Sequence, residues 1–134
     1  MLAYLDGEDA ALRGLFDAVA SSGGAPEELL GLVIGGIQHD ISTRHTRGCP
    51  FINAAAEYPD DGPVRRLVAA HRDWFRATLR ELASAAGLSD PDGVAGALVL
   101  LRDAALVGGY LDGDTRVAPV FGDTARSVIE AHRA

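Results

Sequence analysis

Apolar residues recur at intervals of three and four along most of the chain, which is the spacing of one face of a helix. The clearest face lies in residues 63–86 and includes Val64, His71, Phe75 and Leu79, with arginines on the opposite side. Few stretches alternate apolar and polar residues, as a half-buried strand would. The pattern therefore predicts an all-α fold.

Turn and capping residues divide this pattern into about six helices. Four of them begin at a proline, whose missing N–H costs nothing in the first helical turn. Ser89 or Asp90 suits the cap of the fifth helix, and Gly87 suits the end of the fourth. Because 134 residues is the size of one domain, we interpret residues 1–134 as a single domain. The expected helices span residues 2–21, 26–42, 50–58, 63–86, 91–111 and 115–133.

Glycines interrupt two otherwise apolar helices, and they have two interpretations. Gly31, Gly35 and Gly36 in the second helix allow close helix packing, which we favour, or leave room for a ligand. In the fifth helix, Ala104, Ala105, Gly108 and Gly109 allow another helix to approach closely. That helix is apolar nearly all round, which a surface hairpin cannot bury by itself, so the pattern favours an interface between subunits.

Composition and charge exclude several classes of function. Hydrophobic residues make up 48% of the chain and charged residues 23%, as in a globular domain. The net charge of -7 argues against a surface that binds phosphate groups. Residues 93–111 are apolar, but Arg102 and Asp103 at their centre would each cost roughly 2.5–3.5 kcal/mol inside a bilayer. We therefore expect no membrane span and, with no signal peptide visible, a cytoplasmic protein.

The sequence offers little catalytic or metal-binding chemistry. Cys49 is the only cysteine, so no internal disulfide can form, and the four histidines lack the spacing of a structural zinc site. Cys49 precedes Pro50 and is expected first as a buried thiol, then as a ligand contact or an oxidant sensor, and last as a nucleophile. We expect no metal, no cofactor and no catalytic residue.

His71 lies on the apolar face of the fourth helix, one turn from Trp74 and Phe75. Such a histidine is most often a core residue that is hydrogen-bonded to the backbone. It also suits a polar contact inside an apolar ligand cavity, and Thr78 on the same face suits that role too. Both interpretations remain open at this point.

Several motifs resemble the C-terminal domains of TetR-family transcriptional regulators. They are the run from Arg47 to Tyr58 (RGCPFINAAAEY), Pro63-Val64, the run from His71 to Trp74 (HRDW) and the run from Leu100 to Val107 (LLRDAALV). The resemblance covers essentially the whole chain. It implies a ligand-binding and dimerisation domain whose cavity lies between the first four helices. The first helix would match the connecting helix, so the helix-turn-helix half would precede Met1 and be absent from this chain.

The resemblance also implies an allosteric mechanism and two sets of residues. A small apolar or aromatic effector would shift the first and third helices and change the spacing of two DNA-reading heads on operator half-sites. The last two helices would form a four-helix bundle with those of a second subunit, giving a homodimer. We expect operator binding only through the absent half, and none by these residues alone. The expected ligand-binding residues are Phe16, Ile37, Cys49, Phe51, Asn53, His71, Trp74, Phe75, Thr78 and Tyr110. The expected dimer residues are Leu98, Leu101, Ala105, Gly108, Val117, Phe121 and Val128.

Two other functions compete with this interpretation. A stand-alone dimerisation module would have an empty, collapsed cavity. A small helical enzyme would use Cys49 and His71 as a thiolate pair, and a Cys49→Ala variant would then lose turnover.

Overall fold

The computed structural model describes residues 1–43, 45 and 47–134, and its described part consists of six helices without strands. The all-α prediction is confirmed, and the helix ends lie within two residues of the expected positions. The loop expected from Thr43 to Gly48 includes Arg44 and Thr46, which lie outside the described residues. The helices are α1 (Leu2–Ala20), α2 (Pro26–Thr43), α3 (Pro50–Glu57), α4 (Pro63–Ala85), α5 (Pro91–Asp112) and α6 (Asp114–Ala131).

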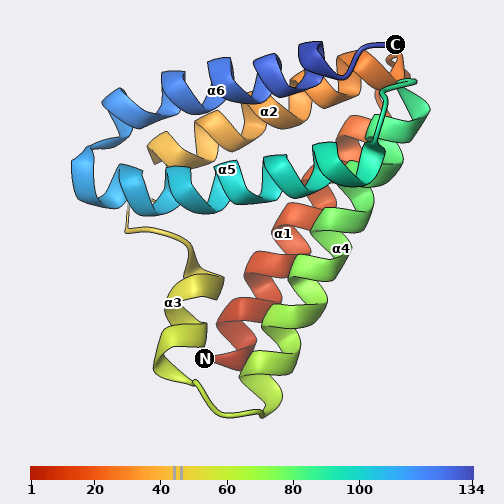
Figure 1. Cartoon of the computed structure of the whole chain (residues 1–134). Helices are drawn as coiled ribbons and strands as arrows, with labels where there is room; N and C mark the ends of the chain where they lie inside the picture. Colours follow the sequence, from red (N-terminus) through yellow and green to blue (C-terminus); the bar gives the residue numbers. More distant parts are fainter. Residues whose placement is uncertain (44, 46) are drawn as a thin grey trace.

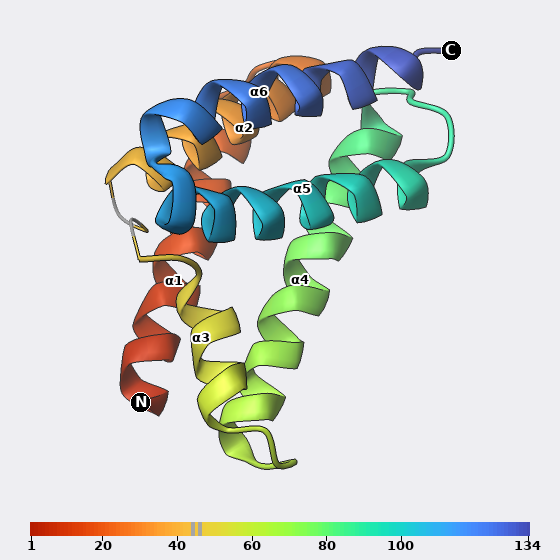
Figure 2. The same cartoon turned by 60° about the vertical axis from the view of Figure 1, so that its left-hand side comes forward.

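The helices form two groups that meet at α4 and α2 (Figure 1). One group, α2, α5 and α6, makes a layer across one end of the molecule, and α1, α3 and α4 extend from it (Figure 2). The second helix packs against α1, α4, α5 and α6, as its nearly all-round apolar sequence predicts. This arrangement places the N-terminal half of α1 beside α3 and α4, away from the α5–α6 hairpin.

The apolar face of α4 forms the centre of the core. Val64, Val68, His71, Phe75 and Leu79 are all buried, as their helical spacing predicts. Arg72 lies off this face, yet it does not point freely into solvent. Its guanidinium donates two hydrogen bonds, at 2.9 and 2.6 Å, to the carboxylate of Asp103 on α5.

The turn between α4 and α5 uses the capping residues that the sequence indicates. Gly87 has a φ of 77°, the left-handed conformation that ends many helices. Asp90 caps α5 by accepting a hydrogen bond from the Gly93 amide at 3.1 Å. A Cβ at Gly93 would meet the Asp90 carboxylate, so glycine at this position makes the cap possible.

The glycines of α2 do not serve close packing within the chain. A Cβ at Gly31, Gly35 or Gly36 would meet no atom within 4 Å, so the favoured packing interpretation is wrong for the described fold. The physical reason is position, because these glycines lie on the exposed or half-buried sides of the helix. Close approach to α2 occurs instead at Gly122 of α6, where a Cβ would collide with Gln38.

Two small residues of α5 pack against neighbouring helices of the same chain, whereas the interface between subunits that their pattern favours stays a prediction. A Cβ at Gly109 would lie 3.3 Å from Ile41 of α2, and one at Gly108 would lie 3.6 Å from Val117 of α6. Of the described helices, α5 alone is long and apolar enough to cross a membrane by length and composition. Only 39% of its most apolar window is buried in the chain, so much apolar surface on α5 remains uncovered.

Candidate functional site

Five rings from α1, α3 and α4 form one connected group, here called the aromatic cluster: Phe16, Phe51, His71, Trp74 and Phe75. Phe51 stacks on His71 with ring centroids 3.6 Å apart and planes 6° apart. Phe16 meets Trp74 and Phe75 edge to face, at 5.3 and 5.9 Å. Such contacts are favourable beyond the area that they bury, so the cluster holds the three helices together.

A polar network links the aromatic cluster to α1. The Nδ1 atom of His71 lies 2.8 Å from Oδ1 of Asp9, and Nε of Arg13 donates to the other oxygen of Asp9 at 2.9 Å. The guanidinium of Arg13 in turn lies over the Trp74 ring, 4.5 Å from its centroid. Asp9 and Arg13 therefore connect the position of α1 to the position of two rings on α4.

The imidazole of His71 is only 1% exposed, and burial lowers its pKa below the usual 6.5. The hydrogen bond with Asp9 opposes this shift, and the positive charge of Arg102 adds to it. Since the Asp9 carboxylate accepts from Nδ1–H, the neutral ring presents a lone pair at Nε2. This buried Nε2 atom has no hydrogen-bond partner among the described residues.

A second buried histidine makes a similar contact with α1. Nε2 of His45, in the segment between α2 and α3, lies 3.1 Å from a carboxylate oxygen of Glu8. Its Nδ1 atom is buried and unpartnered within the described residues. The neighbouring acids Glu8 and Asp9 therefore tie α1 to two different parts of the fold.

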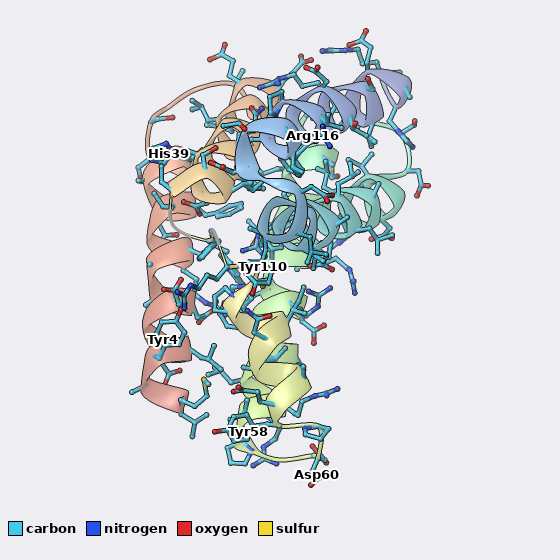
Figure 3. The ribbon with its side chains drawn as sticks, turned by 90° about the vertical axis from the view of Figure 1, so that its left-hand side faces the viewer. Tyr4, His39, Tyr58, Asp60, Tyr110 and Arg116 are labelled. Carbon is cyan, nitrogen blue, oxygen red and sulfur yellow. The ribbon has the colours of Figure 1, made fainter. Side chains whose placement is uncertain are left out.

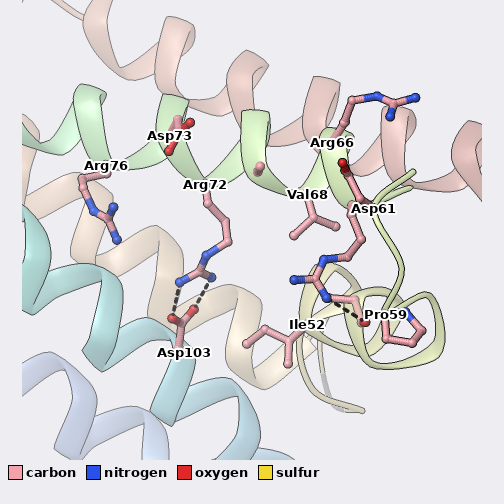
Figure 4. Close-up of a pocket in the computed structure, with 12 residues that line it drawn as sticks. Ile52, Pro59, Asp61, Arg66, Val68, Arg72, Asp73, Arg76 and Asp103 are labelled. Atoms are coloured by element: carbon pink, nitrogen blue, oxygen red, sulfur yellow. Dashed lines mark hydrogen bonds and ion pairs between the residues drawn. The ribbon is translucent and has the colours of Figure 1, made fainter. Parts of the chain in front are cut away.

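Hollows lie on either side of α4. One of about 430 Å³ adjoins the aromatic cluster and is lined by Phe16, Trp74, Thr78 and Leu82. Another of about 650 Å³ is a groove between α3, α4 and α5, where Arg72 reaches across to Asp103 (Figure 4). The first hollow has the volume of a small-molecule site and an aromatic wall. The groove is rimmed by charged side chains.

Within the described residues, no three histidine, cysteine or acidic side chains gather in a group that could hold a metal ion. No hydrogen bond joins Cys49 to His71 in this part of the chain, where the hydrogen-bond partner of the histidine is Asp9. The geometry of a thiolate–imidazole pair is thus not observed.

Comparison with known proteins identifies the fold. No family model matches the sequence, and no curated protein matches it. The structure is similar to the crystal structure of SCO4454, a TetR-family transcriptional regulator from Streptomyces coelicolor, with a TM-score of 0.92. The two sequences are 36% identical, and the match covers 99% of this chain and 71% of that chain. The chain belongs to the TetR family. The members of this family are transcriptional regulators and not enzymes.

The TetR-family fold brings together five of the ten expected ligand-binding residues, and these are the members of the aromatic cluster. Thr78 lies beside them, but its hydroxyl donates to the Trp74 carbonyl at 2.8 Å within its own helix. Ile37 lines a separate small hollow between α1 and α2 that also includes Gly36.

The remaining three expected residues lie outside the cluster. Cys49 is buried at the start of α3, and Asn53 donates to the carbonyl of Arg47 at 3.1 Å. Tyr110 lies on α5 and is 58% exposed, so its ring faces away from the interior (Figure 3). Asp9, Arg13 and Arg102 are polar residues beside the cluster that the sequence did not single out as ligand contacts. The signal for Arg102 was its place at the centre of an apolar helix.

The residues expected at the dimer interface divide into two groups. Leu98, Ala105 and Phe121 are buried in the chain's own core, while Leu101, Gly108, Val117 and Val128 are half-buried. The half-buried residues Leu101, Gly108 and Val117 line a hollow of about 230 Å³ between α5 and α6, together with exposed Ala104 and Val120.

The lowered pKa of His71 predicts how stability depends on pH. Because unfolded chains bind the proton first as pH falls through about 6.5, the free energy of unfolding decreases between that pH and the lower folded pKa. Above pH 6.5 the histidine is neutral in both states and contributes no pH dependence. We expect His71→Phe to flatten this decrease between pH 7 and 5.5, measured by urea unfolding at each pH. The exposed His39 replaced by Phe is the control, and equal slopes for wild type and His71→Phe would contradict a neutral buried imidazole.

Proposed function

We propose that this chain is the effector-sensing and dimerisation domain of a TetR-family regulator. The observation that carries the proposal is the contact between His71 in the aromatic cluster and Asp9 on α1. A molecule that enters the cluster and moves His71 would break or shift its contact with Asp9, and the position of α1 would change with it. The effector would be small and apolar or aromatic, because the cluster and the adjoining hollow are lined chiefly by rings and aliphatic side chains.

The ten ligand-binding residues expected from the sequence enter the proposal unequally. The aromatic cluster would form the binding surface, with Thr78 at its edge. Ile37, Cys49, Asn53 and Tyr110 would act through movements of the helices and loops that carry them. The set as a whole is Phe16, Ile37, Cys49, Phe51, Asn53, His71, Trp74, Phe75, Thr78 and Tyr110.

Dimerisation would use the outer face of the α5–α6 hairpin. Val120 is 61% exposed beside the hollow formed with Leu101 and Val117, and Leu100 and Leu111 on α5 are also exposed. Large apolar side chains that are exposed together mark interaction surfaces on soluble proteins. A second copy presenting the same face would give a homodimer with a four-helix bundle.

Control of DNA would be exerted by a part of the regulator outside these 134 residues. The match covers 71% of the SCO4454 chain, which leaves part of that regulator without a counterpart here. In the proposed mechanism α1 transmits the effector signal to two helix-turn-helix heads that read operator half-sites. Coupling of this kind is typically about 1–3 kcal/mol, within reach of one rearranged polar contact. We place this activity in the cytoplasm, where operator DNA lies in bacteria.

A second candidate function is a stand-alone dimerisation module. One observation favours it: the face-to-face stack of Phe51 on His71 leaves no space between these two rings. A module of this kind would dimerise through α5 and α6 without responding to small molecules.

Binding to the cluster is measurable through Trp74, the only tryptophan, whose ring contacts Phe16 and His71. We expect a set of small aromatic and apolar compounds to include some that change Trp74 fluorescence saturably. Phe16→Ala should abolish this response, while Leu2→Ala, at the exposed start of the same helix, should retain it. Light scattering should give twice the chain mass of 14.0 kDa. A dimer without any fluorescence response would support the stand-alone module, and a monomer at micromolar concentrations would contradict both functions.

A further inference from the structure

A buried carboxylate lies beside an apolar hollow between α1 and α2. Asp40 is 7% exposed and lines this hollow, whose volume is about 60 Å³. The other side chains of the lining are aliphatic or aromatic, Leu12 and Phe16 among them, and Gly36 contributes only backbone. We call this space the Asp40 hollow.

The carboxylate of Asp40 has no partner in the part of the chain that the structure describes. Its oxygens take part in no hydrogen bond or ion pair there, and neither of them is sealed from solvent. A carboxylate that is removed from bulk water without a partner is costly. The last turn of α2, where Asp40 lies, adds to this cost because its free carbonyl groups carry partial negative charge. A cation in the hollow would offset both effects.

The Asp40 hollow is open to solvent at an apolar rim. Gly36 is exposed, and a Cβ at this position would meet no atom within 4 Å. Leu32, one turn earlier on α2, is 53% exposed, Leu15 on α1 is 46% exposed, and both line the hollow. The volume is about twice the 30 Å³ that one water molecule occupies in the liquid. The hollow therefore has room for the head group of a ligand, whose apolar body would lie along the rim.

The surroundings of the Asp40 hollow favour a positive charge. Phe16 separates it from the larger hollow of about 430 Å³, since this residue lines both. The larger hollow has two exposed acids in its lining, Asp17 and Glu81. Within the described residues, no basic side chain lines either hollow. Arg13, the cation beside the aromatic cluster, is paired with a carboxylate of its own helix.

We propose that the effector is a small lipophilic amine, whose ammonium group binds the carboxylate of Asp40 and whose apolar body lies against Leu32 and Phe16. This inference rests on the proposed sensing function and names the chemical class of the molecule sensed. An ammonium group donates charge-assisted hydrogen bonds to a carboxylate, and these are strongest where little water competes. Because the site joins α1 to α2 beside Phe16, its occupation would change the position of α1 and of the aromatic cluster.

The test compares hexylamine, octylamine and phenethylamine with hexanol, octanol and phenethyl alcohol, using Trp74 fluorescence and thermal unfolding. The Trp74 ring lies 5.3 Å from the Phe16 ring, so a ligand that moves Phe16 alters the fluorescence. We expect each amine to bind wild-type protein at least tenfold more tightly than the alcohol with the same carbon skeleton.

Asp40→Asn removes the charge and keeps the shape of the side chain. Without ligand it should melt at the wild-type temperature or higher, because an unpartnered buried charge is lost. It should also lose at least tenfold of the affinity for the amines and keep the affinity for the alcohols. Asp6→Asn is the matched control, since Asp6 is an exposed carboxylate on α1 outside the lining of the hollow. This variant should bind the amines as wild type does.

Gly36→Leu tests the space instead of the charge. The added side chain would cover the rim of the hollow, and it should raise the melting temperature because glycine is unfavourable inside a helix. The affinity for the amines should fall at least tenfold. Gly31→Leu is the matched control, because Gly31 is an exposed glycine of the same helix that does not line the hollow.

Several results would overturn the inference. Equal binding of amines and alcohols to wild-type protein, or equal binding of amines to wild type and Asp40→Asn, would refute recognition of the charge while leaving effector sensing intact. An Asp40→Asn protein that melts well below wild type, or fails to fold, would show that the carboxylate stabilises the fold. A Gly36→Leu protein that binds amines like wild type would show that the hollow is not the site.

Failure of this inference is distinguishable from failure of the sensing function on which it rests. If neutral aromatic compounds change Trp74 fluorescence saturably and no amine does, the choice of amine is wrong and sensing stands. If no compound of any class changes the fluorescence, the proposed sensing function fails and this inference fails with it.

Discussion

A Phe75→Ala variant is expected to unfold with a free energy about 3–5 kcal/mol lower than that of wild type. Phe75 is 2% exposed and contacts rings on α1 and α4 as well as the guanidinium of Arg102. Removal of the ring leaves a cavity between three helices and takes away the aromatic contact of Arg102. Urea unfolding followed by circular dichroism measures the difference directly.

Phe75→Leu is the matched control for this large effect. It keeps most of the apolar volume and should cost about 1.5 kcal/mol or less, apart from the lost contact with Arg102. If Phe75→Ala is no more destabilising than Phe75→Leu, the aromatic cluster is loosely packed in solution. The close contacts between its rings would then contribute little to the free energy of unfolding.

The helices could be predicted from the sequence because the residues that define each helix lie within it or at its ends. The 3.6-residue spacing of Val64, Val68, His71, Phe75 and Leu79 defines the buried face of α4 without knowledge of any other helix. Helix ends are local too, since the Asp90 cap and the left-handed Gly87 depend only on neighbouring residues. These signals explain why the six helices match their expected ranges.

The candidate site was predictable only on the helix that dominates it. His71, Trp74 and Phe75 share a face of α4 and could be grouped by spacing. The partner of His71 could not, because Asp9 lies 62 residues away and a short acidic run looks like a solvated helix start. The sequence interpretation of a histidine bonded to the backbone is replaced by a side-chain pair for the same reason. Tyr110 joined the expected set through family resemblance, and its exposure depends on how α5 rotates in the layer.

The fifth helix connects the two proposed activities of the domain. Neighbouring residues of α5 point to different faces of the helix. Arg102 contacts Phe75 of the aromatic cluster, while Leu101 and Ala104 line the outer hollow against α6. Asp103 adds a direct tie to α4 through Arg72. An effector that moves Arg102 would therefore act on a helix that also carries the dimer surface. Sensing and dimerisation would be thermodynamically linked through α5.

The largest effect on assembly is expected from Val120→Glu. Val120 is 61% exposed, so the substitution leaves the core of the chain intact. In a two-fold symmetric dimer the change introduces two carboxylates at one apolar interface, where each loses water without gaining a partner. We expect the dissociation constant to rise at least 100-fold, which corresponds to about 3 kcal/mol. Light scattering over a dilution series should show monomers at concentrations where wild-type protein is dimeric.

Tyr58→Glu is the control for added charge on an exposed apolar residue. Tyr58 lies at the tip formed by α3 and the following loop, far from Arg116 at the start of α6 (Figure 3). This variant should remain dimeric, and both variants should keep wild-type helicity by circular dichroism. A Val120→Glu protein that dimerises like wild type would show that the α5–α6 face is not the interface. The exposed apolar residues of α5 would then require another partner, and linkage of sensing to dimerisation through this helix would no longer hold.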